Sequence, residues 1–266
     1  MADTKTMAAA NPLALRDAEA RAEAASSHVH IIRPGVRCIT DKRGHATPNG
    51  GSPFELVVDA SEGFIPLWAQ DVTLRWQFAD GTLAQFQNPT AAGAAIEQLF
   101  GEALVEWGDA APVRFSKNTD AWDFEIVIKG ADDCDPNGCV LASAFFPDAG
   151  RHKLYIYPIL FHQPRDEQVA TLVHEIGHAF GLRHFFALLS EQSAPAKIFG
   201  THNKFTIMNY GDASKLTPAD RSDLKKLYEL AWSGHLKKIK GTPIKFVKPY
   251  HDLPKTDGAL AIAAVG

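Results

Sequence analysis

The sequence predicts an α+β protein in which a twisted sheet packs against helices. Apolar and polar residues alternate over residues 74–78, which is typical of a half-buried strand. An apolar stripe then predicts a helix from a Thr90 cap to about Trp107, ended by Gly108. Two further apolar runs, 113–115 and 124–128, predict strands. This strand-helix-strand-strand order favours a sheet with a helix on one face.

Composition bounds the class of protein. The 266 residues are 45% hydrophobic and 22% charged, a profile typical of a globular chain with one sizeable core and extensions. The net charge of −4 argues against nucleic acid as a partner, and no apolar run approaches the length of a membrane span. We expect a monomer. The first ten residues lack a hydrophobic signal-peptide core, so we expect a cytoplasmic location or export by a non-classical route.

The chain divides into three predicted parts: residues 1–61, residues 62–232 and residues 233–266. The first part begins with a loosely docked arm rich in Ala, Glu and Arg, followed by irregular chain over 28–53. Together these residues form either a free arm or a pro-segment that covers the active-site cleft. The third part is rich in lysine, and we expect these lysines to form a solvated face or, alternatively, an exosite for acidic partners.

The most specific signal is the motif H-E-x-x-H-x-x-G-x-x-H at residues 174–184. On a helix, His174 and His178 point from one face and can bind one metal ion. Gly181 can adopt a positive φ, end the helix and let His184 supply a third nitrogen. Three imidazoles with one open position are typical of a catalytic zinc site. Glu175 lies between the histidines, where it can reach a water molecule.

This motif resembles that of the metzincin zinc endopeptidases, and the resemblance covers roughly residues 62–232. Residues 206–211 (TIMNYG) resemble the Met-turn, with Met208 supporting the metal site and Tyr210 beside it. Residues 141–147 (LASAFFP) resemble the strand before the active-site helix in matrixins. The resemblance implies a twisted, mostly parallel sheet with an antiparallel edge strand. It also implies that an active-site helix and a backing helix pack on this sheet, and that a C-terminal helix follows.

The resemblance implies zinc-dependent hydrolysis of peptide bonds in polypeptides, with Glu175 as the general base. Tyr210 would bind zinc at rest and then stabilise the oxyanion; its alternative role is packing beneath the site. Ser143 stands where matrixins carry a histidine of a second, structural zinc site, so we expect one zinc ion. The rival interpretation is a non-catalytic zinc-containing binding protein on the same scaffold. The intact Glu175 argues against it.

The predicted edge strand has four residues expected to pair with an extended substrate through main-chain hydrogen bonds: Leu141, Ala142, Ser143 and Ala144. Such pairing favours internal cleavage over aminopeptidase activity. A further strand is expected around residues 154–157, a long functional loop over 185–205, and a last helix starting at Thr217.

The three cysteines are odd in number and too few for a disulfide-built scaffold. Arg37-Cys38 resembles the cysteine switch of matrixin propeptides, in which a thiolate occupies the open zinc position. The alternative is a partly buried lone thiol. Cys134 and Cys139 flank a polar turn and would form a disulfide in an oxidising compartment.

Part of that turn matches the first half of a calcium loop. The oxygen-bearing residues are Asp133, Asp135 and Asn137, and Gly138 stands at the sharp turn. The twelfth position is Ala144 instead of Glu, so the loop is not an EF-hand. It is either a partial Ca²⁺ site or a polar turn that needs no ion.

Overall fold

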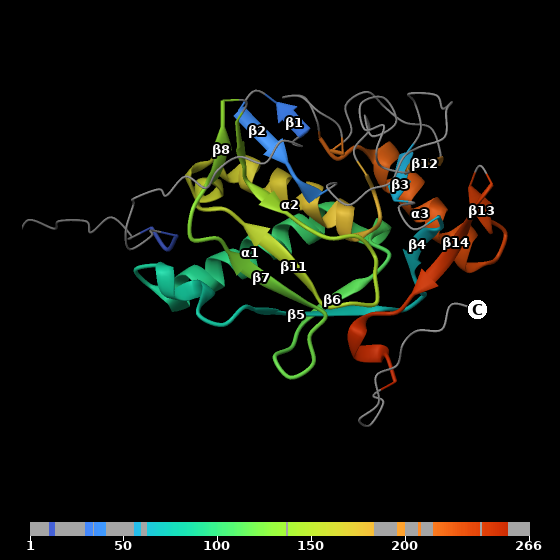
Figure 1. Cartoon of the computed structure of the whole chain (residues 1–266), viewed down its shortest axis with the longest axis horizontal. Helices are drawn as coiled ribbons and strands as arrows, with labels where there is room; N and C mark the ends of the chain where they lie inside the picture. The colour runs from blue at the N-terminus through green and yellow to red at the C-terminus, as the bar shows by residue number, and fades with distance from the viewer. Residues whose placement is uncertain are drawn as a thin grey trace, which may run out of the picture.

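The structure is a computed structural model of the whole chain (Figure 1). It describes residues 11–13, 30–33, 35–40, 56–59, 63–136, 138–183, 196–199, 207–208, 215–239 and 241–254. In these ranges, no helix is long and apolar enough to cross a bilayer. The division of the chain at residues 62 and 232 remains a prediction.

A five-stranded sheet forms the centre of the molecule, in the order β10-β11-β7-β5-β6. The bounds of these strands are β5 Thr73–Phe78, β6 Arg114–Lys117, β7 Phe124–Ile128, β10 Ala142–Ser143 and β11 His152–Ile156. All neighbours are parallel except β10, which pairs antiparallel with β11 at the edge. The predicted mostly parallel sheet with an antiparallel edge strand is confirmed.

Two helices, α1 (Pro89–Trp107) and α2 (Arg165–Ala179), lie together on one face of this sheet (Figure 1). The cap of α1 was wrongly predicted at Thr90: the Asn88 side chain accepts a hydrogen bond from Ala91 N at 3.1 Å, and the helix begins at Pro89. Aromatic side chains fill the space between α1 and the sheet, with the Phe100 ring 5.5 Å from the rings of Trp76 and Phe115. The Trp107 indole at the end of α1 donates to Val173 O at 3.0 Å, which connects α1 to α2.

The third helix, α3 (Pro218–Trp232), contacts the end of α2 through Tyr228. Thr217 and Asp220 form a capping box that starts it. The Tyr228 hydroxyl donates to Phe180 O at 2.9 Å, and the Trp68 indole donates to Ala179 O at 2.7 Å. Both carbonyls belong to the last turn of α2, so neighbouring elements satisfy the groups that a helix end leaves open. Gly181 follows with φ 92°, as the sequence predicts.

Part of the C-terminal extension completes a sheet, while its lysines Lys237, Lys238, Lys245 and Lys248 are exposed, as predicted. β14 (Thr242–Val247) pairs in parallel with β4 (Ile65–Trp68) and antiparallel with β13 (Lys238–Ile239). The short helix η6 (Tyr250–Asp252) follows, and the backbone N–H of His251 donates to Asp123 Oδ1 at 2.9 Å. The partner strand β4 lies far away in sequence, so local patterning could not reveal this pairing.

Four short strands form a sheet in the order β1-β2-β9-β8. They are β1 His30–Arg33, β2 Gly35–Cys38, β8 Asp133–Asp135 and β9 Gly138–Val140. Two predictions are corrected here. Residues 30–38 form strands instead of irregular chain, because β9 offers them an edge. The predicted edge strand over residues 141–144 is shorter, because β10 spans only Ala142–Ser143 and Leu141 separates it from β9.

The remaining elements connect this framework. β3 (Leu56–Asp59) pairs antiparallel with β12 (Ala196–Phe199). Three short 3-10 helices lie in connections: η2 Thr82–Gln85, η3 Gly108–Ala110 and η4 Pro158–His162. The predicted strand around 154–157 is β11, which begins two residues earlier and ends at Ile156.

Candidate active site

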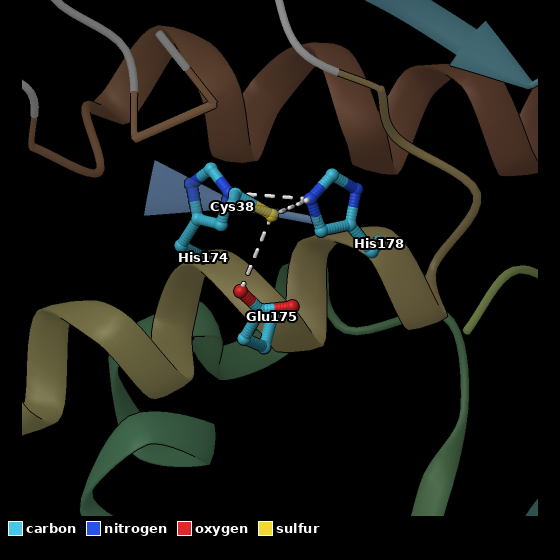
Figure 2. Close-up of side chains that lie close together, drawn as sticks. All are labelled: Cys38, His174, Glu175 and His178. Carbon is cyan, nitrogen blue, oxygen red and sulfur yellow. Dashed lines mark hydrogen bonds between the residues drawn. The ribbon is translucent and has the colours of Figure 1, made fainter. Parts of the chain in front are cut away.

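Helix α2 places His174, Glu175 and His178 at one buried point of the molecule (Figure 2). The two Nε2 atoms of the histidines lie 3.2 Å apart. These residues and Cys38 each offer one ligand atom, and the four atoms lie within 4.8 Å of one another. The i, i+4 spacing on the helix therefore brings the two imidazoles together as the sequence predicts.

Backbone carbonyls fix the tautomer of both histidines. His174 Nδ1 lies 2.7 Å from Ile207 O, and His178 Nδ1 lies 2.8 Å from Leu182 O. A carbonyl oxygen only accepts, so each Nδ1 carries the proton and each neutral ring leaves Nε2 as a bare acceptor. Two lone-pair nitrogens 3.2 Å apart can both bind one cation. The donor set therefore fits zinc, which takes neutral imidazole nitrogens.

Met208 lies under the helix at Gly177. A Cβ atom added at Gly177 would lie 2.5 Å from Met208 Sδ and 3.2 Å from Trp107 Cζ2. Glycine is therefore required there for close packing, and Met208 is itself 2% exposed. The same turn supplies the Ile207 carbonyl that orients His174. His184 and Tyr210 lie outside the described residues, so their predicted roles stay predictions.

Cys38 comes from β2, far away in sequence, and its side chain is buried against the helix (Figure 2). Its Sγ lies 3.6 Å from His178 Nε2 and 3.6 Å from Glu175 Oε1. Two residues later, the Thr40 hydroxyl donates to Glu175 Oε2 at 2.9 Å and accepts from Ala144 N at 2.9 Å. Residues 38–40 therefore contact both the histidine pair and the carboxylate.

Arg37 anchors this segment on the other side of β2. Its Nη2 donates to Asp133 Oδ1 at 2.7 Å and to Asp133 O at 2.9 Å, and its Nη1 donates to Asp135 Oδ2. Cys134, between the two carboxylates, forms a disulfide with Cys139 that closes the β8–β9 hairpin. Arg37 thus occupies two of the three oxygen ligands expected for calcium. Asn137 lies outside the described residues, and the calcium site stays a prediction.

The predicted edge strand lines the site. Leu141, Ala142 and Ser143 are buried, and Ala144 N is bonded to Thr40. A groove of about 590 Å³ runs beside it, and Thr40, Ala144 and Phe146 are among its lining residues. The N-terminal segment and the edge strand therefore lie side by side, and Thr40 connects Ala144 to Glu175.

Sequence reasoning did not assign Thr40 to the site, and it assigned Asp133 and Asp135 to a possible calcium loop without recognising Arg37 as their partner. Thr40 lies two residues after Cys38 and has no motif of its own. The Arg37 contacts span 96 and 98 residues of chain, so only the pairing of β2 with β9 reveals them.

A sheet with an antiparallel edge, an H-E-x-x-H helix and a methionine turn beneath it define a metallopeptidase fold of the metzincin class. The chain belongs to the matrixin family, whose family model matches residues 68–229. Two curated relatives are each 31% identical to it. Metalloendoproteinase 4-MMP of Arabidopsis thaliana matches over 135 residues, 45% of this chain and 38% of the relative. Macrophage metalloelastase of Rattus norvegicus matches over 107 residues, 36% of this chain and 23% of the relative.

The chain therefore spans well under half the length of these relatives. Among solved structures, the "Structure of myroilysin" aligns with 65% of this chain and 98% of that chain, at 13% identity and a TM-score of 0.41.

Proposed function

We propose that the protein is a zinc-dependent endopeptidase that cleaves peptide bonds within polypeptides. The observation that carries this proposal is the facing pair of His174 and His178 Nε2 atoms, 3.2 Å apart, with the Glu175 carboxylate beside them. Membership of the matrixin family and the names of both curated relatives support it.

In this proposal His174, His178 and His184 hold one zinc ion. Zinc bound there would supply Lewis-acid activation of a water molecule and of the scissile carbonyl. Glu175 accepts the proton from that water and delivers it to the leaving amine. Tyr210 donates a hydrogen bond to the developing oxyanion. The β9–β10 edge holds the substrate backbone in an extended form.

We also propose that the N-terminal segment keeps the enzyme latent. Cys38 Sγ lies beside the histidine pair, and the Thr40 hydroxyl donates to the carboxylate assigned as the base. With this segment in place Glu175 is only 1% exposed, so a polypeptide substrate has no access to it. This favours a cysteine switch over the alternative of a lone buried thiol.

Casein cleavage by the full-length Cys38→Ser variant tests the proposal. We expect chelator-sensitive fragments from internal cuts, restored by added zinc, and lower activity from the wild-type chain. A variant that binds one zinc ion but releases no fragments would support the rival, a non-catalytic zinc-containing binding protein. Trimming of single residues from peptide ends would instead indicate an aminopeptidase.

A further inference from the structure

Residues 35–40 pair with β9 and with Ala144, the edge that the proposed function assigns to the substrate backbone. β2 pairs in parallel with β9, and Thr40 continues the contact by accepting from Ala144 N at 2.9 Å. Between these two contacts, Cys38 lies 3.6 Å from the base, Glu175. The contacts of residues 35–40 therefore identify the surfaces of the site that can bind an extended peptide.

The surface with the most hydrogen bonds to this segment is formed by Asp133 and Asp135, which bind Arg37. In the guanidinium, Nη1 donates to the Asp135 carboxylate, and Nη2 donates to both a carboxylate oxygen and the backbone carbonyl of Asp133. The Arg37 side chain is fully buried, whereas the Asp133 and Asp135 side chains keep 18% and 12% exposure. A planar fork with fixed donors matches this arrangement of three oxygens, and an ammonium group does not.

We infer that Asp133 and Asp135 form a substrate subsite that selects an arginine side chain. The inference rests on the proposed endopeptidase function. When the segment leaves, both carboxylates and the Asp133 carbonyl lose the guanidinium, and a substrate arginine replaces it. Arg37 directly precedes Cys38, and a strand advances about 3.3 Å per residue. The recognised arginine therefore lies about one or two residues from the cleaved bond.

The hairpin itself makes the subsite rigid. Asp133 and Asp135 flank Cys134 on β8, and the disulfide to Cys139 ties this strand to β9, the strand with which residues 35–37 pair. The acid pair and the substrate backbone are thus held by the same two strands. A fixed distance between them sets the position of the selected residue relative to the cut.

Paired peptides test the subsite. The protein is the full-length chain carrying Arg37→Ala and Cys38→Ser. Without the Arg37 side chain, Asp133 and Asp135 are available to bind an arginine of the peptide. Quenched fluorescent peptides carry arginine or citrulline, its uncharged isostere, at each of the three positions on either side of the cut. We expect one position at which arginine raises kcat/KM by roughly tenfold or more.

Adding Asp133→Asn and Asp135→Asn, singly and together, should bring the arginine-to-citrulline ratio close to one. Asp109→Asn, a change in an exposed acid paired with Lys225 on another face, should leave the ratio intact. Thermal unfolding of each variant identifies any that fail to fold. No position with a preference above twofold, or a preference that survives the double Asn change, would overturn the inference.

Equilibrium binding separates this inference from the proposed function. The fluorescence anisotropy of the labelled arginine and citrulline peptides is measured with the same variants. Tighter arginine binding that depends on both aspartates, without cleavage of any peptide, would refute the endopeptidase and keep the subsite. Equal binding and equal cleavage of the two peptides would refute the subsite and keep the endopeptidase.

Discussion

Replacing Arg37 with alanine should release the N-terminal segment from the site. The change removes three hydrogen bonds to Asp133 and Asp135, two of them between charged groups. Hydrogen bonds to charged groups contribute about 1.5–3 kcal/mol, and loss of one partner of a buried pair costs about 3–5 kcal/mol. Both carboxylates keep some exposure, so water offsets part of the loss, and we expect about 2–3 kcal/mol.

That free energy raises the population of the open form roughly 30- to 150-fold. Cys38 is the only cysteine outside the disulfide, so its alkylation by iodoacetamide reports opening without relying on activity. We expect the alkylation rate of Arg37→Ala to rise by that factor. Arg165→Ala removes an exposed arginine paired with Glu102 and serves as the matched control. An unchanged rate in Arg37→Ala would refute the anchoring role.

Three further predictions concern the framework of the site. Gly177→Ala should cost about 1–3 kcal/mol and weaken zinc retention, because its Cβ meets Met208. Unfolding and chelator competition measure this, and Gly101→Ala, with open space around it, should cause no loss. Tyr228→Phe should cost about 1–3 kcal/mol in thermal unfolding, since Phe180 O loses its donor. Burial raises the pKa of Tyr228, so stability that is present below about pH 10 is lost as the pH rises further, and the Phe variant lacks this component in alkaline titrations. Reducing Cys134–Cys139, or replacing both with serine, should lower the thermal midpoint by about 4–8 °C and speed Cys38 alkylation less than Arg37→Ala does, because the β8–β9 hydrogen bonds remain.

The elements that the sequence predicts well are those with a local physical cause. Helix α2 carries His174 and His178 at i, i+4, and the positive φ of Gly181 needs no tertiary partner. The capping box of α3 lies within four residues. These features depend on spacing along the chain, which the sequence contains directly.

The elements that escape prediction depend on distant partners. β14 exists because β4 offers it an edge, and β2 exists because β9 does. The carbonyl of Ile207 orients His174 through backbone geometry that no side-chain pattern encodes. For the same reason, the Asp133–Asp135 turn resembles an ion site in sequence, while the structure fills it with Arg37.

The central claim is that α2 combines metal ligands with a separate general base. It is tested most directly by measuring zinc content and peptide cleavage together in full-length Cys38→Ser and in the same chain with Glu175→Ala. We expect both proteins to bind one zinc ion, and the Glu175→Ala change to lower kcat/KM at least about a hundredfold. Equal cleavage by the two proteins, or zinc missing from both, would contradict the account.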